Sequence, residues 1–220
     1  MLKLDYHPFA SFCHKALIAL YEKELPFEPV LIDLGTPEDR ARLQSVWPMM
    51  KFPVLRDEAA ARIIPESSLI IEYLDEIAPG RPRMIPTDPR AALQARMWDR
   101  FFDGFIAVNV TKIVTDQFRP DDRRDHDGIA QAEATMRQAL DLFEREIAGR
   151  EWAIGDEFSL ADCSAAPALF YAGTIVPLDG YSQTQAYFQR LLARPSFARV
   201  VEEARPYRHF FPLPWPASYQ

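Results

Sequence analysis

The fold is decided by Lys51-Phe52-Pro53-Val54-Leu55 and, a few residues later, by Ile63-Ile64-Pro65-Glu66-Ser67-Ser68-Leu69-Ile70-Ile71-Glu72-Tyr73-Leu74. The runs Val54-Leu55 and Ile63-Ile64 are short and apolar, as in two adjacent buried strands. Proline has no N–H to donate, so Pro53 suits the first position of a strand. From Leu69 the apolar residues repeat at helical spacing, and we expect a helix to begin at Glu66-Ser67.

The residues before this stretch predict a strand, a helix, a second strand and a short helix. The first strand is predicted at residues 2–6, and a helix follows from Ser11, whose side chain is expected to be the N-cap. Residues 27–34 form the second strand, and Thr36-Pro37-Glu38 opens the short helix. The order βαβα followed by ββα predicts a mixed sheet with one parallel pair and one hairpin.

Strand signals nearly vanish after Pro89, and helical patterns replace them. One apolar seam follows Leu93, Met97, Phe101 and Phe105, with Trp98 and Phe102 beside it, and a second runs from Ile129 to Ile147. Ser159 and Asp162 have the spacing of a helix-capping pair. Pro167 should kink or loosen the helix that follows. The aromatic tail, Tyr207 to Trp215, is rich in proline; we expect it to be non-helical and to lie on the helices or across a site.

The whole chain resembles the bacterial-type cytosolic glutathione S-transferases, most specifically at the strand–proline–strand–Glu-Ser–helix segment. The resemblance implies an α/β thioredoxin-like N-terminal domain followed by an all-α C-terminal domain. The corresponding division is residues 1–78 for glutathione binding, 79–88 for a linker and 89–220 for a helical domain with an electrophile pocket and the aromatic, proline-rich tail. It also implies glutathione as co-substrate, a role in detoxification and a homodimer.

The resemblance assigns glutathione contacts to five residues. Pro53 is expected to be cis, and the backbone of Phe52 to pair with the tripeptide. Ser67 would donate to the γ-glutamyl carboxylate at a helix N-terminus, and Glu66 would accept from the ammonium group. Lys51 would reach the cysteinyl-glycine end, where Arg40 and Arg42 are weaker candidates.

The residue that activates the thiol is less clear from the sequence. The family uses a tyrosine on the first strand, or a serine or cysteine where the first helix starts, and the pattern puts Ala10 at that second position. Ser11 is the first candidate, Cys13 the second and Tyr6 the third. The proposed reaction is the addition of glutathione sulfur to an apolar electrophile, for which Trp98, Phe102, Phe105, Tyr171 and the tail are candidate pocket residues.

Composition limits the alternatives. A net charge of −7 gives no basic surface for nucleic acid or membrane, and no apolar run is long enough to cross a bilayer. The start of the chain lacks the apolar region of a signal peptide, and the two distant cysteines favour a reducing cytoplasm. The four histidines show no metal-ligand spacing. Two other functions remain open: thiol–disulfide exchange through Cys13, and glutathione binding without catalysis.

Overall fold

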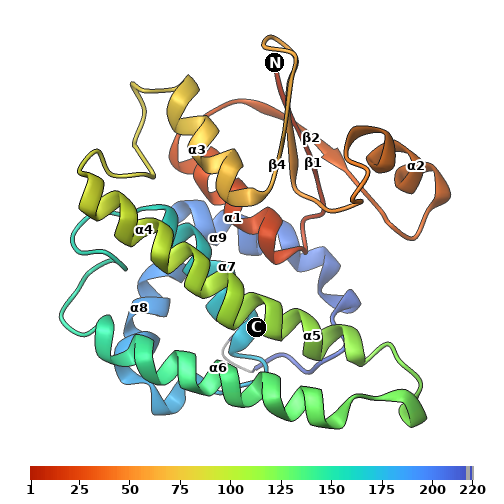
Figure 1. Ribbon diagram of the computed structural model, residues 1–220, viewed down its shortest axis with the longest axis vertical. Helices are drawn as coiled ribbons and strands as arrows, with labels where there is room; N and C mark the ends of the chain where they lie inside the picture. Colours follow the sequence, from red (N-terminus) through yellow and green to blue (C-terminus); the bar gives the residue numbers. More distant parts are fainter. Residues whose placement is uncertain (217–218, 220) are drawn as a thin grey trace.

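The computed structural model of the protein describes residues 1–216 and 219. Its first part is a four-stranded sheet with three helices (Figure 1). The elements are β1 (Leu2–Tyr6), α1 (Ser11–Glu22), β2 (Phe27–Leu31), α2 (Pro37–Val46), β3 (Val54–Asp57), β4 (Arg62–Pro65) and α3 (Ser67–Ile77). The strand order is β2-β1-β3-β4, with β1 parallel to β2 and β3 antiparallel to both β1 and β4. The predicted mixed sheet is therefore confirmed.

Both faces of the sheet are covered by packed side chains. Neighbouring residues of β3 point to opposite faces, so they belong to different cores. Leu55 and Leu4 belong to the main core, which includes the buried residues of α1 and α3. Val54 instead packs with Ile32 and Leu43, a smaller core between the sheet and α2. Figure 1 shows α1 and α3 side by side, with α2 standing apart from them.

The second part is helical, as predicted. Its helices are α4 (Pro89–Phe101), a π-helical segment (Phe102–Ala107), α5 (Val108–Asp116), α6 (His126–Glu146), α7 (Leu160–Ala172), α8 (Ser182–Ala193) and α9 (Pro195–Ala204), with 3₁₀ turns at Asp121–Arg123, Leu178–Gly180 and Arg205–Phe210. Every residue of α7 is buried, so this helix is the centre of the helical part. Ser159 and Asp162 form the predicted capping box at its start, and the helix continues through Pro167.

Three expectations from the sequence were wrong in detail. Ala10, not Ser11, is the N-cap of α1: Ala10 has extended backbone and its carbonyl accepts from Cys13 and His14, so Ser11 is already helical. The tail is partly helical, because a proline is tolerated in the first turn of the segment Arg205–Phe210. The second strand ends at Leu31, before the predicted end at residue 34. The first apolar seam of the helical part runs over Leu93, Met97, Phe101 and Phe105.

That seam divides between core and surface. Leu93, Met97 and Phe105 are 69%, 46% and 51% exposed, whereas Phe101, together with Trp98 beside the seam, is buried. Leu93, Met97 and Phe105 therefore face outward, whereas Phe101 of the same seam packs inward with Trp98. An exposed apolar row on a folded surface is typical of an interface.

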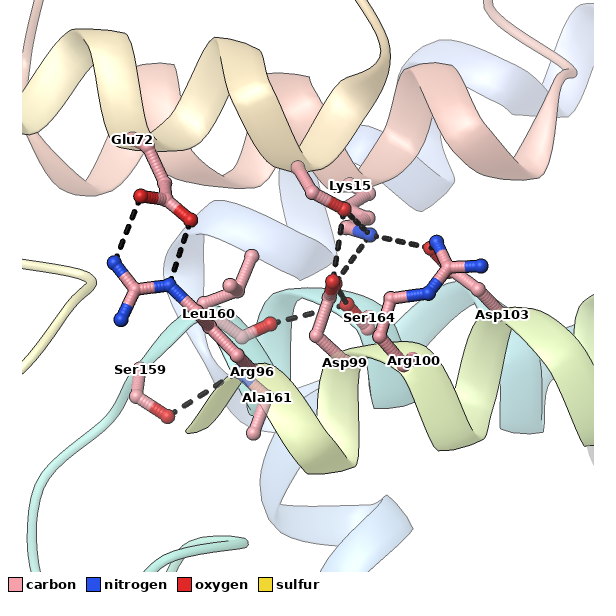
Figure 2. Close-up of polar contacts among 11 residues, drawn as sticks. Lys15, Glu72, Arg96, Asp99, Arg100, Asp103, Ser159, Leu160, Ala161 and Ser164 are labelled. Carbon is pink, nitrogen blue, oxygen red and sulfur yellow. Dashed lines mark hydrogen bonds and ion pairs between the residues drawn. The ribbon is translucent and has the colours of Figure 1, made fainter. Parts of the chain in front are cut away.

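A buried polar cluster joins the two parts of the molecule (Figure 2). The Lys15 ammonium on α1 donates to the Ser68 hydroxyl of α3 at 2.8 Å and to the Asp103 carboxylate at 2.9 Å, and it pairs with Asp99 of α4. Ser68 and Ser164 each donate to Asp99, at 2.8 and 2.5 Å. The first turn of α3 is thus fixed against α1, α4 and α7. No helix within the described residues has the length and apolar character of a membrane span.

Candidate functional site

A cavity of about 660 Å³ lies between the α/β part and the helical part. One wall comes from the α/β part and consists of Phe9, Ala10, Ser11, Phe12, Leu34, Trp47, Met50, Lys51, Phe52, Pro53, Glu66 and Ser67. The opposite wall comes from α5, α7 and the tail, and consists of Val110, Thr111, Val114, Thr115, Phe118, Tyr171, Phe210 and Phe211. The charged lining residues, Lys51 and Glu66, are both on the first wall, whereas the second wall is uncharged and combines apolar side chains with the hydroxyls of Thr111, Thr115 and Tyr171.

The N-terminus of α1 presents hydrogen-bond donors at the first wall. Ala10 caps the helix without a side-chain hydrogen bond. Among the described residues, the N–H groups of Ser11 and Phe12 have no backbone partner, because the first amide paired within the helix is that of Cys13. The Ser11 side chain is partly exposed and lines the cavity. Two amides and one hydroxyl at a helix N-terminus are suited to bind an anion.

The N-terminus of α3 presents a second set of donors at the same wall. Ser67 is the first helical residue, and the first amide paired along the helix is that of Ile70, which donates to the Glu66 carbonyl at 2.9 Å. Glu66 itself has φ 70° and ψ 119°, a conformation that costs a glutamate of the order of 1–3 kcal/mol. Such strain is concentrated at functional sites, and here it presents an exposed carboxylate beside the Ser67 hydroxyl.

The connection before β3 completes this wall. The Phe52–Pro53 peptide bond is cis, as the resemblance predicted. The ladder between β3 and β4 starts at Val54, and no backbone hydrogen bond to Phe52 is formed within the described residues. Lys51 is exposed, lines the cavity and has no acidic partner among the described residues. The unpaired backbone of Phe52 and the ammonium group of Lys51 are therefore adjacent on this wall.

The opposite wall includes some of the predicted pocket residues and excludes others. Tyr171, Phe210 and Phe211 line the cavity. Trp98 and Phe102 do not: they pack on Phe143 in the helical core, at ring-centroid distances of 5.3 and 4.9 Å. Their predicted place in the pocket was wrong, because the π-helical segment and α4 turn them inward. Phe105 points outward and does not line the cavity.

Two candidates for thiol activation lie away from the cavity. Cys13 is fully buried one turn into α1, where burial raises the pKa of its thiol to about 12. Only a minute fraction of that thiol is ionised near neutral pH. Tyr6 lies on β1 and lines a separate hollow with Tyr21, Arg199 and Tyr207. Of the candidates, only Ser11 lines the cavity.

The two arginines proposed for the glycine carboxylate are engaged elsewhere. Arg40 donates to the Leu34 carbonyl at 2.7 Å, and Arg42 pairs with Asp39 and donates to the Leu31 carbonyl. Neither lines the cavity. Within residues 1–216 and 219, no group of three or more histidine, cysteine or acidic side chains is arranged to hold a metal ion.

Several lining residues were missed from the sequence. Val110 and Val114 of α5 are four residues apart, and Phe118 follows at the same interval, so a helical stripe was visible. Nothing in the stripe itself distinguishes a cavity wall from a core contact. Trp47 and Met50 follow α2, in a turn whose direction depends on packing beyond the local sequence.

The site is thus a cleft between a thioredoxin-like sheet and a helical bundle, with two helix N-termini on one side and mainly uncharged side chains on the other. Comparison with known families agrees with this. Residues 6–82 match the profile "Glutathione S-transferase, N-terminal domain", and residues 106–195 match "Glutathione S-transferase, C-terminal domain". The chain belongs to the glutathione S-transferase family.

Individual relatives are distant. "Glutathione S-transferase-like protein LUC7" of Fusarium is 31% identical over 144 residues, covering 64% of this chain and only 62% of that protein. "Glutathione S-transferase GstB" of Escherichia coli K12 is 27% identical over 191 residues, covering 85% and 91%. A glutathione S-transferase structure from Methylobacterium radiotolerans, in complex with glutathione sulfonate, superposes with a TM-score of 0.79 at 28% identity, covering 90% and 93%.

Proposed function

We propose that the protein is a glutathione transferase that adds the thiolate of glutathione to an apolar electrophile. The observation that carries this proposal is the convergence of two free helix N-termini, at Ser11 and Ser67, on one wall of a cavity whose other wall is apolar. The first wall is suited to bind an anionic peptide, and the opposite wall is suited to bind a hydrophobic partner. The proposal assigns glutathione binding to residues 1–78 and the electrophile to residues 89–220, with residues 79–88 as linker.

We place glutathione along the first wall with its γ-glutamyl end at α3 and its glycine end at Lys51. Its γ-glutamyl carboxylate accepts from the Ser67 hydroxyl and the free amides of α3, and its ammonium group donates to Glu66. The middle of the tripeptide pairs with the backbone of Phe52 beside Pro53. The cysteinyl-glycine end extends toward Lys51, the one cationic side chain among the described residues that line the cavity. The sulfur then lies toward the first turn of α1.

The chemical step needs a thiolate at neutral pH. Donors at the start of α1, which are the Ser11 hydroxyl and the amides of Ser11 and Phe12, stabilise the sulfur anion and lower the pKa of the bound thiol. The thiol proton leaves to solvent and the sulfur bonds to the electrophilic carbon. In a substitution the leaving group departs with the electron pair of its bond; in an addition the π electron pair moves to the neighbouring atom, which takes a proton from solvent. The apolar side chains of Val110, Val114 and Phe211 hold the electrophile against the sulfur and limit the access of water.

A second function, glutathione binding without catalysis, is favoured by one observation. Ala10 occupies the position where the family usually has its serine or cysteine, so the customary side chain is missing. Turnover of a generic aryl halide separates the two functions, because a binding protein would not accelerate it. Thiol–disulfide exchange through Cys13 has less support, since that thiol is buried and un-ionised. Reduction of a mixed disulfide with glutathione tests it.

Replacing Ser67 with alanine is expected to weaken glutathione binding about 10–100-fold, because a charge-assisted hydrogen bond typically contributes ~1.5–3 kcal/mol. Glu66→Ala should weaken it to a similar extent through loss of the ammonium contact. Titration calorimetry measures both. Ser45→Ala is the matched control, since Ser45 is an exposed serine on α2 that does not line the cavity. Unchanged affinity in both site variants would refute this placement of glutathione.

We also propose a homodimer formed by the exposed apolar residues of α3 and α4. Leu69 and Leu93 are 53% and 69% exposed. They lie at helical spacing from Glu72 and Arg96, whose bidentate pair at 2.8 and 2.9 Å links the two helices (Figure 2). Ser68 also contacts Asp99, so the two helices run antiparallel here, and Leu69 and Leu93 extend the exposed apolar surface on opposite sides of this ion pair. Association of two copies would bury this apolar surface.

We also propose the cytoplasm as the compartment, because both cysteines are free thiols.

Introducing a charge into this exposed apolar surface, as in Leu93→Glu, is expected to shift the protein from dimer to monomer. A carboxylate buried twice in a two-fold interface has no partner and pays a desolvation cost in each copy. Light scattering at micromolar concentration measures the mass. Leu142→Glu is the control, because Leu142 is 39% exposed on α6, away from this surface. A parent protein with the mass of a single chain would rule out the dimer.

A further inference from the structure

The connection between β1 and α1, residues His7 to Ala10, is held by hydrogen bonds from two buried side chains. The Phe9 amide donates to Nδ1 of His7 at 3.1 Å, and the Ala10 amide donates to the His7 carbonyl at 3.1 Å. The next two carbonyls, of Pro8 and Phe9, each accept a hydrogen bond from a side chain. His14 of α1 binds the first of them, and Tyr171 of α7 binds the second.

The hydroxyl of Tyr171 donates to the Phe9 carbonyl at 2.9 Å, and Nε2 of His14 donates to the Pro8 carbonyl at 2.6 Å. A carbonyl only accepts, so the His14 proton is on Nε2. Both residues are buried, Tyr171 at 4% exposure and His14 at 0%. A buried carbonyl that loses its donor is costly, so these two contacts define the direction of both peptide planes.

Aromatic rings reinforce the contact with Phe9. The ring of Tyr171 packs edge-on against Phe9 at 5.6 Å, and Phe211 and Trp215 of the tail each reach the same ring at 6.0 Å. Phe9 is thus enclosed by a helix of one part and by the tail. The residues directly after it, Ala10 and Ser11, carry the cap and the free donors of α1.

We propose that Tyr171 is a positioning residue: its hydroxyl, by holding the Phe9 carbonyl, sets the direction of the Ser11 hydroxyl and the first amides of α1 toward the sulfur of bound glutathione. The inference rests on the proposed function, since it concerns the same sulfur site. Tyr171 acts across the interface between the two parts, so the helical part contributes to activation of the thiol as well as to the electrophile pocket.

A purely structural role for Tyr171 makes a different prediction, and the chain offers a matched control. Tyr187 is also a fully buried tyrosine, and its hydroxyl donates to Asp162 at 2.6 Å. It does not line the cavity. Tyr187→Phe therefore removes a buried hydroxyl of the same kind without touching the connection at Phe9.

The test compares Tyr171→Phe, Tyr187→Phe and the parent. In Tyr171→Phe we expect a higher pKa of bound glutathione, read from thiolate absorbance against pH, and a ~2–10-fold lower kcat with an aryl halide at saturating glutathione, the loss of one neutral hydrogen bond. The dissociation constant of glutathione should change less than about twofold, because its main contacts lie on α3 and at Phe52. Tyr187→Phe should leave the thiol pKa and kcat unchanged.

A parent-like titration and kcat in Tyr171→Phe would overturn the inference, and so would equal changes in both variants. If the parent itself does not ionise glutathione, the proposed function fails. Hydrogen exchange of residues 7–12 then still decides the positioning role: faster exchange in Tyr171→Phe but not in Tyr187→Phe supports it, and equal exchange refutes it.

Discussion

Replacing Lys15 with methionine is expected to lower the free energy of unfolding by about 3–5 kcal/mol, the cost of leaving buried carboxylates without their cation. Lys15 is 1% exposed and contacts Asp99 and Asp103, as Figure 2 shows, and it also donates to Ser68. Urea unfolding measures the loss. The exposed pair between Lys112 and Asp125 provides the control, since Lys112→Met should cost less than about 1 kcal/mol.

The same variant should depend on pH in a defined direction. Burial raises the pKa of Asp103, and the Lys15 ammonium opposes that rise, so removing the ammonium raises the pKa further. A carboxyl group with a higher pKa in the folded than in the unfolded state favours folding when protonated. The loss of stability should therefore be largest near neutral pH and shrink as the pH falls through the raised pKa. A loss as small as that of Lys112→Met at every pH would refute the role of the cluster.

Replacing Ser11 with alanine is expected to slow conjugation near neutral pH about 10–100-fold, the effect of one positioned charge-assisted hydrogen bond on the sulfur anion. The pKa of bound glutathione should rise with the same change. Part of the activation should survive, because the free amides and the dipole at the start of α1 remain. Thiolate absorbance against pH and aryl halide turnover give the two readouts.

Cys13→Ala is the control for this experiment, and it should leave conjugation nearly intact because the Cys13 thiol is buried and un-ionised. If Ser11→Ala titrates like the parent while Cys13→Ala or Tyr6→Phe shifts, the assignment to Ser11 is wrong. If the parent does not lower the pKa at all, the protein binds glutathione without activating it.

The sheet and the order of elements were predictable because their signals are local. Val54-Leu55 and Ile63-Ile64 are short apolar runs, and they pair as β3 and β4 with Leu55 opposite Ile64. Ser159 caps α7 as its spacing with Asp162 predicts, and Pro37 lies in the first turn of α2 as expected. Each of these features depends on residues close in sequence, where turn chemistry and helix capping act.

The cavity was only half predictable. Lys51, Phe52, Pro53, Glu66 and Ser67 lie within one stretch of sequence, and the structure brings them to one wall. The opposite wall depends on how distant helices rotate against each other. An apolar stripe looks the same whether it faces a core, a cavity or solvent.

Helix rotation explains the individual errors. Trp98 turned out to be core, and Leu93 turned out to be surface. In the sequence, Tyr171 was only one of several aromatic candidates for the pocket. Its hydrogen bond to the Phe9 carbonyl was not predictable, because the two residues are 162 positions apart. Contacts of this range have no local signature in the sequence.

The location of Trp47 has a practical consequence. The chain has four tryptophans, of which Trp98 and Trp152 are buried in the helical part, while Trp47 is partly exposed and lines the polar wall of the cavity. Indole emission responds to the polarity of its surroundings, so we expect the emission of Trp47 to change when a ligand occupies this wall of the cavity. Occupancy of the cavity can be followed by fluorescence with no label attached, separately from turnover.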